Sequence, residues 1–387
     1  MKLIYLTSRF PYPINKGDKL RSFHQIKELS KQNDIYLISL SEIKVPKSSI
    51  KQLDKYCKSV HVYHISLINR IFNLLKTLIN NRPFQVNYFY HHKIQKKINS
   101  NISVIKPDHI FCQLVRTALY VKDEHSIPKT LDYMDALSKG LERRIKISKF
   151  WQKPFVKMEW QRMKRFENLA FEFFNNHIII SSSDRNEIAH INNKNIEIIP
   201  NGIDANYFQK IITDKIYDLI FIGNLSYVPN IEAAKFISKK IFPLLQEKVP
   251  NIKILISGSN PSKKVLRLSN ENIKVTGWVD DIRETYCSGK VFFAPMSLGS
   301  GLQNKLLEAM SLGIPCITSN LCNESLGATH MKNIIIGNSV EQYISQILNI
   351  LSKPELISEI GKNGREFVNK KFSWESSNKI LMEILKR

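Results

Sequence analysis

The sequence predicts an α/β protein made of two similar halves, each with a parallel sheet and helices on both faces. Short apolar strands alternate with amphipathic helices along the first half of the chain, and this order is typical of parallel sheets. A turn at Pro200-Asn201-Gly202 interrupts the alternation, and the same pattern then begins again. A chain of 387 residues is long enough for two domains, each with its own core.

The predicted strands of the first half are short apolar runs bounded by polar or turn-forming residues. They lie at residues 3–7, 35–40, 60–65, 109–113, 129–132 and 177–181. An amphipathic helix is expected at residues 20–31, after a loop that carries two prolines and Gly17.

The second half repeats this arrangement. Its strands are predicted at residues 218–223, 252–257, 273–276, 291–295 and 333–336, with a further strand that begins at residue 316. Its helices are predicted at residues 231–245, 283–287, 303–312, 342–351 and 354–369, and a last amphipathic helix at residues 374–386.

The chain is strongly basic, with a net charge of +23 and a hydrophobic content of 43%. The hydrophobic content is that of a soluble globular protein. The charge favours anionic partners, namely nucleic acid, acidic lipid or phosphorylated substrates, although a lysine- and asparagine-rich genome would account for part of it.

The sequence gives no sign of secretion, membrane crossing or a zinc site. Five cysteines are scattered without a C-x-x-C pair, which is expected of a reduced, cytoplasmic protein. The N-terminus has only a four-residue apolar run and is predicted to be a strand, not a signal peptide. No stretch approaches the roughly 20 apolar residues of a membrane-spanning helix.

The segment at residues 292–319 predicts a nucleotide site. An apolar strand runs into a loop with Gly299 and Gly301, an amphipathic helix follows, and a second apolar strand begins at Cys316. The amino end of such a helix suits a phosphate. Lys305 and Glu308 lie three apart on one helix face, where a cation near phosphates and a carboxylate near a ribose would fit a nucleotide. An ordinary βαβ unit with a solvated lysine and glutamate is the alternative.

The whole segment resembles the donor-binding segment of GT-B glycosyltransferases of the family-4, or group 1, type. That family carries K-x-x-E-A-M-x-x-G-x-P, and the matching residues here are Lys305, Glu308, Ala309, Met310, Gly313 and Pro315. The wording QNKLLEAM is most similar to sugar transferases of bacterial exopolysaccharide clusters. The resemblance implies a GT-B fold: two Rossmann-like domains facing across a cleft, with the C-terminal helix crossing back to the first.

A second matching motif sets the expected domain boundaries. The family's linker, P-N-G-[IV]-D-x-x-x-F, corresponds here to Pro200, Asn201, Gly202, Ile203, Asp204 and Phe208. Asn-Gly suits a tight hinge turn, because both residues tolerate positive φ. We expect an acceptor-binding domain at residues 1–198, a nucleotide-sugar-binding domain at 199–371 and a crossing helix at 372–387.

The resemblance also implies which residues contact the donor. They are Gly223, Asn224, Trp278, Val279, Ser300, Gly301, Leu302, Gln303, Asn304, Lys305 and Glu308. For Trp278, a place in the core is an equal alternative to packing against a nucleobase.

Two departures from the family pattern stand out. The loop at residues 224–230 lacks the arginine and lysine that many family members use on the diphosphate, and Ser300 stands where a glutamate is usual. The chain also has no D-x-D triplet, so no metal is expected. No cofactor is expected beyond the nucleotide sugar itself, a UDP- or GDP-sugar, as substrate.

In the first half, candidate site residues follow predicted strands or begin helices. Gly17, Lys16 and Arg21 surround a helix start, and Arg116 follows the strand at residues 109–113. Asp132 ends the next strand and Asp135 follows it, at the kind of sheet edge where α/β ligands bind.

By resemblance to the family, these residues divide into two groups. Asp135, Gly17 and Arg21 are expected to be catalytic, and Lys16, Arg116 and Asp132 to contact the acceptor. The alternative is that they cap helices or carry solvated charges.

Residues 139–174 form an unusually basic and aromatic segment. It combines nine lysines or arginines from Arg143 to Arg165 with Trp151, Phe155 and Trp160. A surface that meets acidic lipid headgroups would have this composition, and so would a solvated helix pair. No known nucleic-acid-binding motif accompanies it, so nucleic acid is not an expected partner.

The combined expectation is a cytoplasmic glycosyltransferase, peripheral at the inner face of the cell membrane. It would move a sugar from a nucleotide-sugar donor to a lipid-linked or growing glycan acceptor in cell-surface polysaccharide biosynthesis, with retention of configuration and without a metal. The alternatives are a GT-B nucleotide-sugar epimerase and a catalytically idle binding subunit.

Overall fold

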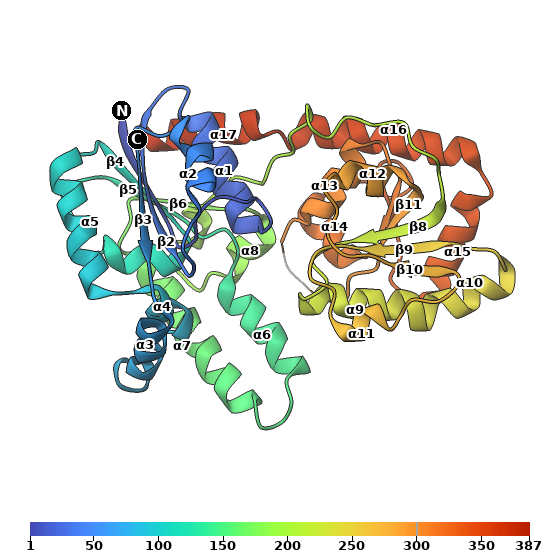
Figure 1. The fold of residues 1–387 in the computed structure, drawn as a ribbon, viewed down its shortest axis with the longest axis horizontal. Coiled ribbons are helices and arrows are strands. Elements are labelled where there is room, and N and C mark those ends of the chain that lie inside the picture. The colour runs from blue at the N-terminus through green and yellow to red at the C-terminus, as the bar shows by residue number, and fades with distance from the viewer. Residues whose placement is uncertain (299–300) are drawn as a thin grey trace. The chain divides into compact units, whose positions relative to one another are not determined.

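The computed structural model describes residues 1–298 and 301–387, and it confirms the predicted α/β class. The chain forms two compact units (Figure 1). Unit 1 comprises Met1–Asn201 and Trp374–Arg387, and unit 2 comprises Gly202–Ser373. Each unit is built on one parallel sheet.

The sheet of unit 1 has seven strands in the order β3-β2-β1-β4-β5-β6-β7, all parallel. Their bounds are β1 Lys2–Thr7, β2 Asp34–Ser41, β3 Ser59–His64, β4 His109–Gln113, β5 Lys129–Asp132, β6 Asn176–Ile179 and β7 Glu197–Ile198. The central strands are apolar on both faces because helices cover both, and this is why they read as continuous apolar runs in the sequence.

Helices pack on the two faces of this sheet. They are α1 Gly17–Leu29, α2 Lys47–Asp54, α3 Leu67–Asn80, α4 Phe84–Phe89, α5 His92–Ile105, α6 Leu137–Ile147, α7 Lys153–Phe171, α8 Ser182–Glu187 and α17 Trp374–Leu385. Successive residues of β1 point to opposite faces, so Leu3 and Tyr5 lie in one core and Ile4 and Leu6 in the other.

The sheet of unit 2 has six parallel strands in the order β10-β9-β8-β11-β12-β13. The strands are β8 Tyr217–Ile222, β9 Ile254–Ser257, β10 Ile273–Val275, β11 Gly289–Ala294, β12 Cys316–Thr318 and β13 Ile335–Ile336. The helices are α9 Val228–Phe236, α10 Phe242–Lys248, α11 Lys263–Leu266, α12 Ile282–Cys287, α13 Asn304–Ser311, α14 Asn320–Leu326, α15 Val340–Leu351 and α16 Pro354–Lys371.

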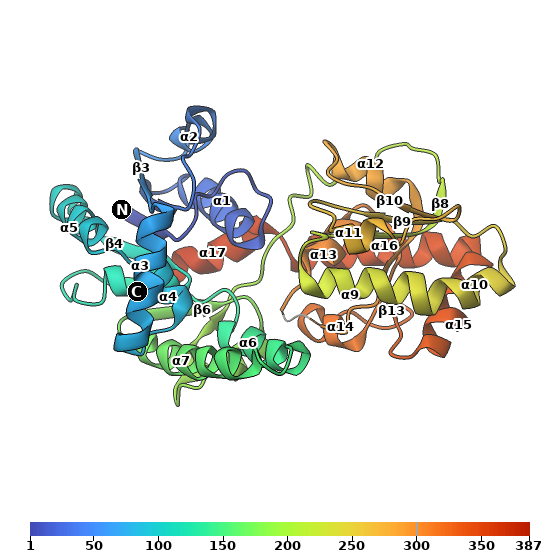
Figure 2. The same cartoon turned by 60° about the horizontal axis from the view of Figure 1, so that its bottom comes forward.

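Every strand predicted from the sequence lies within two residues of its observed position. The helix predicted at residues 231–245 consists of α9 and α10 joined by a π-helical turn at Ile237–Ile241, and the three pieces form one continuous rod in Figure 2. Helices α2 to α5 and α8 of unit 1, helices α11 and α14 of unit 2 and the short strand β7 were not predicted.

In each unit the strand order reverses beside one central strand. Strand β1 pairs with β2 on one side and β4 on the other, and β8 pairs with β9 and β11. The loops that leave the carboxyl ends of such neighbouring strands diverge to opposite faces of the sheet. Ligands of open α/β sheets bind in the crevice between them.

The C-terminal helix α17 belongs to unit 1, which confirms the prediction that it returns to the first domain. The Trp374 ring stacks on His24 of α1, with ring centres 4.8 Å apart and an angle of 6° between the planes. Leu381 and Ile384 lie in the same core as Leu3 and Tyr5. The last residues of the chain are therefore part of the first core.

We expect Leu381→Ala to lower the free energy of unfolding of unit 1 by about 2–5 kcal/mol, because Leu381 is fully buried and its removal leaves a cavity. Urea unfolding would measure the loss. The neighbouring Ile380→Ala is the matched control, because Ile380 is 44% exposed. Equal effects of the two substitutions would contradict the position of α17.

Candidate functional site

The first candidate site lies where β8 and β11 end in unit 2. Gly223 follows β8, and a side chain there would come within 2.8 Å of Asn230 Nδ2. Gly258 follows β9 with φ of +145°, and a Cβ there would lie 1.7 Å from the Gly223 carbonyl oxygen. Only glycine permits this approach of two backbones. The carbonyl of Asn224 accepts a hydrogen bond of 2.9 Å from Asn230 Nδ2.

Lys305, in the first turn of α13, extends to the same place. Its Nζ donates to Asn230 Oδ1 and lies 3.8 Å from Met296 Sδ and 5.0 Å from the centre of the Phe221 ring. Burial lowers the pKa of Lys305 to about 8. A partly desolvated ammonium group held by neutral partners gains from a phosphate more than a solvated lysine would.

Glu308 lies one turn further along α13. Its carboxylate accepts a 2.8 Å hydrogen bond from the Tyr286 hydroxyl, which is also 3.3 Å from the Lys305 carbonyl oxygen. Burial raises the pKa of Glu308. Tyr286, in α12, is completely buried and fixes the Glu308 side chain. Sequence reasoning missed Tyr286 and Asn230, since each acts through a residue that is distant in the chain.

The other predicted donor residues divide into two groups. Gly301 has φ of +74°, Leu302 is 9% exposed, and Gln303 and Asn304 form the start of α13. Trp278 and Val279 follow β10, two strands away from β8, and Trp278 is 67% exposed, so it is not a core residue. Ser300 lies outside the described residues.

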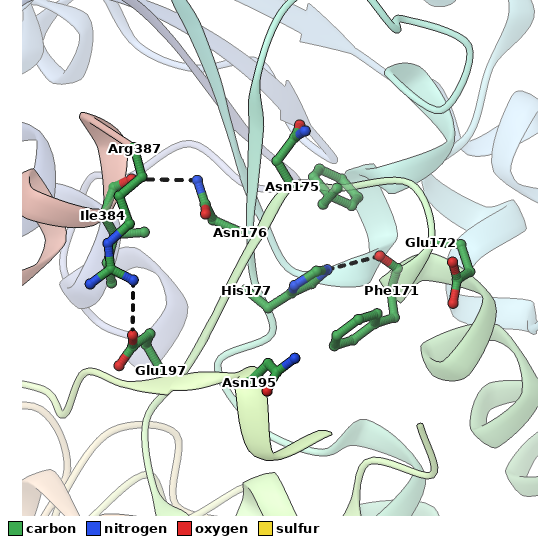
Figure 3. Close-up of a pocket in the computed structure, with 10 residues that line it drawn as sticks. Phe171, Glu172, Asn175, Asn176, His177, Asn195, Glu197, Ile384 and Arg387 are labelled. Atoms are coloured by element: carbon green, nitrogen blue, oxygen red, sulfur yellow. Dashed lines mark hydrogen bonds and ion pairs between the residues drawn. The ribbon is translucent and has the colours of Figure 1, made fainter. Parts of the chain in front are cut away.

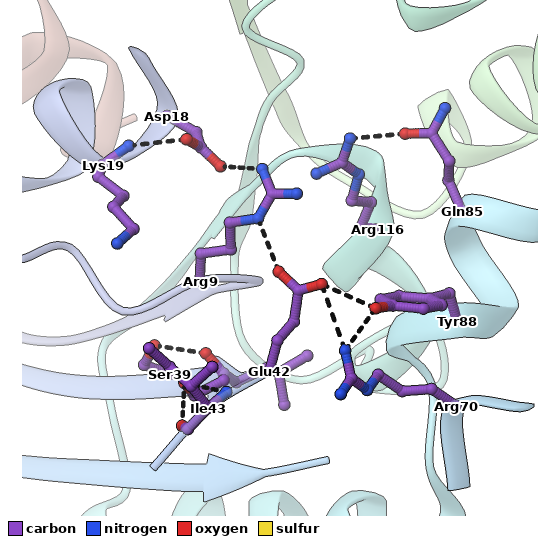
Figure 4. Close-up of polar contacts among 12 residues, drawn as sticks. Arg9, Asp18, Lys19, Ser39, Glu42, Ile43, Arg70, Gln85, Tyr88 and Arg116 are labelled. Carbon is purple, nitrogen blue, oxygen red and sulfur yellow. Dashed lines mark hydrogen bonds and ion pairs between the residues drawn. The ribbon is translucent and has the colours of Figure 1, made fainter. Parts of the chain in front are cut away.

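The second candidate site lies in unit 1, at the carboxyl ends of β1 and β4 (Figure 4). Arg9 follows β1 and Arg116 follows β4, and their guanidinium carbons lie 5.8 and 5.4 Å from the centre of the Phe89 ring. Arg9 forms ion pairs with Asp18 at 2.9 Å and Glu42 at 3.2 Å. Two arginines thus converge on the point where the strand order reverses.

Glu42 anchors the other side of this cluster. Burial opposes its ionisation, but hydrogen bonds from Tyr88 and Arg9 outweigh burial and lower the pKa of Glu42. The Tyr88 hydroxyl donates to it at 2.8 Å, and Arg70 Nη1 donates to that hydroxyl at 2.6 Å. Sequence reasoning missed these residues because they follow β2 or lie on α3 and α4.

Arg116 has hydrogen-bonding capacity that the fold leaves unused. Its Nη2 donates to Gln85 Oε1 at 2.5 Å, while Nε and Nη1 are buried and have no partner in the described part of the chain. Burial lowers the pKa of Arg116 to about 10. Buried polar groups are nearly always paired, so an anion is the natural partner for these two N–H groups.

Asp135 lies beyond β5 in the same unit. Burial, followed by the charge of Asp184, raises the pKa of Asp135 to about 7. Asp184 is in the first turn of α8, and its Oδ2 accepts a 2.6 Å hydrogen bond from Ser181. A carboxyl group that titrates near neutral pH can exchange a proton with a substrate hydroxyl.

Arg21 and Asp132 have no exposed surface, and they form a buried ion pair. Arg21 Nε donates to Asp132 Oδ2 at 2.6 Å, and Nη1 donates to the Ile199 carbonyl and to Asn201 Oδ1. The pair joins α1 to β5 and to the end of the first chain segment of unit 1. We therefore assign Arg21 and Asp132 a structural role, in place of the catalytic and acceptor-contact roles expected from the sequence.

Lys16 and Gly17 are both exposed at the start of α1. No atom lies within 4 Å of the position that a Cβ on Gly17 would occupy. The structure thus gives no steric reason for glycine at this position.

Figure 3 shows a separate cavity of unit 1, of about 210 Å³. Its lining includes Asn175 and Asn176, at the amino end of β6, together with His177, Ile384 and Arg387. Arg387 pairs with Glu197 at 3.1 Å across it. The cavity is at the opposite edge of the sheet from Arg9, Arg116 and Asp135, so it is not part of the site described above.

Within residues 1–298 and 301–387, no group of three or more His, Cys, Asp or Glu side chains is arranged to hold a metal ion. Over the same residues, no helix is both long enough and apolar enough to cross a bilayer.

Comparison with known proteins identifies the class. Residues 217–353, which make up most of unit 2, match the family "Glycosyl transferases group 1". An uncharacterized 44.6 kDa protein in the cps region of Klebsiella pneumoniae is 25% identical over 100% of this chain and 99% of its own length.

Two further similarities are informative. An Escherichia coli UDP-Gal:alpha-D-GlcNAc-diphosphoundecaprenol alpha-1,3-galactosyltransferase is 29% identical over 41% of this chain and 48% of its own length. The crystal structure of HepE from Anabaena in complex with UDP and glucose superposes with a TM-score of 0.72 at 14% identity, over 99% of both chains. At 14% identity, the similarity to HepE is evidence for the fold alone.

The fold and the family match together define a transferase of the GT-B class. The match to the group 1 glycosyltransferases covers residues 217–353, and these include the Lys305 to Pro315 segment that predicted it.

We expect Asp132→Ala to lower the free energy of unfolding by about 3–5 kcal/mol, because it leaves the Arg21 charge buried without its partner. Urea unfolding would measure this. Asp34→Ala, which removes an exposed pair with Lys58, is the control and should change stability by less than about 1 kcal/mol. Unchanged stability with lost activity would restore the acceptor-contact interpretation of Asp132.

The raised pKa of Asp135 predicts a pH-dependent stability. Between about pH 4 and pH 7 the folded protein holds a proton that the unfolded chain has released, so the free energy of unfolding falls as the pH rises. Asp135→Asn removes the contribution of Asp135 to this slope, while Glu167, whose pKa burial also raises to about 7, keeps its own contribution. Above pH 7 we expect the variant to be more stable than wild type by roughly 1–3 kcal/mol, and near pH 4 to be equally stable.

Urea unfolding at a series of pH values tests this expectation. The control is Asp123→Asn, since the Asp123 side chain is 81% exposed and should show no pH-dependent difference from wild type. Parallel pH profiles of wild type and Asp135→Asn would contradict the assigned environment of Asp135.

Proposed function

We propose that this glycosyltransferase moves a sugar from a nucleotide-sugar donor, a UDP- or GDP-sugar, to a lipid-linked or growing glycan acceptor in cell-surface polysaccharide biosynthesis. The cps-region location named for the Klebsiella relative supports the pathway class. The diphosphoundecaprenol acceptor named for the Escherichia coli relative supports a lipid-linked acceptor, and the UDP in the HepE complex supports the donor class.

The observation that carries this proposal is the position of Lys305 and Glu308. Both are on α13, beside the carboxyl ends of β8 and β11, in the unit that matches the group 1 family. Lys305 binds the donor diphosphate, and Glu308, held by Tyr286, binds the ribose hydroxyls. Lys305 and the amino end of α13 then stabilise the negative charge that grows on the departing diphosphate.

In unit 1, Arg116 and Asp135 are the proposed acceptor residues. The two unpaired N–H groups of Arg116 suit a phosphate of a lipid diphosphate acceptor. Asp135, which titrates near neutral pH, is the proposed partner of the acceptor hydroxyl. We propose that transfer retains the anomeric configuration and needs no metal, because Lys305 and the helix terminus supply the positive charge.

The proposed location is cytoplasmic and peripheral, at the inner face of the cell membrane. A diphosphate-linked lipid acceptor is held in the membrane, so an enzyme that uses it works at the bilayer surface. The net charge of +23 favours association with anionic lipid.

Calorimetric binding of UDP-, GDP-, ADP- and CMP-sugars tests the donor site. We expect one nucleotide class to bind, and Lys305→Ala and Glu308→Ala each to weaken it by about 10- to 100-fold, because each removes a charge-assisted contact. The exposed residues Lys274 and Glu271 supply the matched controls, Lys274→Ala and Glu271→Ala.

Two outcomes would count against the proposal. Failure of every nucleotide sugar to bind would remove the donor site and favour a catalytically idle subunit. Sugar product formed without any acceptor would favour an epimerase.

A further inference from the structure

Helix α3 of unit 1 presents its apolar side to solvent. Six of its apolar side chains are 51–87% exposed, namely Leu67, Ile68, Ile71, Phe72, Leu75 and Ile79. At 100° per residue these positions span about 140° of the helix circumference, a single continuous stripe. A helix on the surface of a globular protein normally shows the reverse pattern, with its apolar stripe against the core.

The polar side of α3 faces the protein instead. Asn73 is 5% exposed and Thr77 is fully buried. Asn73 Nδ2 donates to the Tyr90 carbonyl at 2.6 Å, and Arg162 Nη1 of α7 donates to the Thr77 carbonyl at 2.9 Å. Arg70 is bonded to Tyr88. The orientation is thus fixed by specific hydrogen bonds, and rotation of α3 to bury its stripe would break them.

The connection between α6 and α7 lies at the same edge of unit 1 as the C-terminal end of α3 (Figure 1). It carries two large exposed side chains, Phe150 at 85% and Trp151 at 56%, and Phe155 in the first turn of α7 is 63% exposed. Residues 143–158 contain six lysines or arginines and no Asp or Glu, and residues 67–80 contain no Asp or Glu either. Apolar and cationic side chains are therefore combined on this edge.

We propose that the exposed stripe of α3, together with the α6–α7 connection, docks unit 1 on an anionic phospholipid bilayer. The choice of a bilayer rests on the proposed function and on charge: apolar side chains bordered by lysine and arginine, with Trp and Phe beside them, match an acidic headgroup interface. A helix that lies flat in the interface would bury the whole stripe at once.

Co-sedimentation with phosphatidylcholine vesicles, with and without phosphatidylglycerol, tests the proposal. Wild type is expected to bind the phosphatidylglycerol vesicles and to dissociate as salt rises. The double variant Phe72→Gln/Ile79→Gln should bind them more weakly by about tenfold or more. Both side chains are exposed, so thermal stability should not change.

Val104→Gln/Ile191→Gln is the matched control, because these apolar side chains are 80% and 91% exposed on unit 1 outside the stripe. It should bind as wild type does, while Lys153→Glu/Lys157→Glu should lose the preference for phosphatidylglycerol.

Nucleotide-sugar binding by the same variants separates this proposal from the proposed function. Vesicle binding that depends on α3, in a protein that binds no nucleotide sugar, would uphold the docking surface and remove the donor assignment. The proposed docking surface would be wrong if wild type bound neither vesicle type. It would also be wrong if the α3 variant bound the vesicles as strongly as wild type does. A stable oligomer that the α3 variant dissociates would overturn it too, since a second copy would then cover the stripe.

Discussion

Parallel strand pairing is the constraint on which the rest of this structure depends. Because every strand of a sheet runs in the same direction, all the carboxyl ends meet at one edge, and residues far apart in the chain are brought together there. Arg9 and Arg116 are neighbours for this reason, as are Gly223 and Gly258. The crossover helices that this topology requires then supply the remaining side chains, such as Glu308.

Burial has the same effect on the charged groups of the two candidate sites, and the Arg21–Asp132 pair differs from both. In unit 2, burial lowers the pKa of Lys305 and raises that of Glu308, so both charges are costly until a ligand contacts them. In unit 1, burial likewise lowers the pKa of Arg116 and raises that of Asp135. Arg21 and Asp132, by contrast, bond to each other, and Arg21 also bonds to Ile199 and Asn201. A buried charged group that lacks partners in the fold indicates a ligand-binding role, and one whose partners are all in the fold indicates a structural role.

Helix α3, which turns its apolar side to solvent, is the feature of the fold that bears on where the proposed reaction takes place. A lipid-linked acceptor lies in a membrane, and a transferase that reaches it gains from lying on that surface. The apolar stripe would supply membrane affinity, and the lysines and arginines of residues 143–158 would supply preference for anionic lipid. Both features belong to unit 1, which also carries Arg116 and Asp135.

The sequence by itself determined the α/β class, the two parallel sheets and the likeness of unit 2 to the group 1 glycosyltransferases, because apolar strands and the Lys305 to Pro315 motif are local patterns. Only the tertiary structure decided which charged residues are available. The sequence could not show that Arg21 forms a buried ion pair with Asp132, or that the Tyr286 hydroxyl donates a hydrogen bond to Glu308. Nor could periodicity show which side of α3 faces solvent. Burial and pairing depend on residues distant in the chain, which only the folded protein brings together.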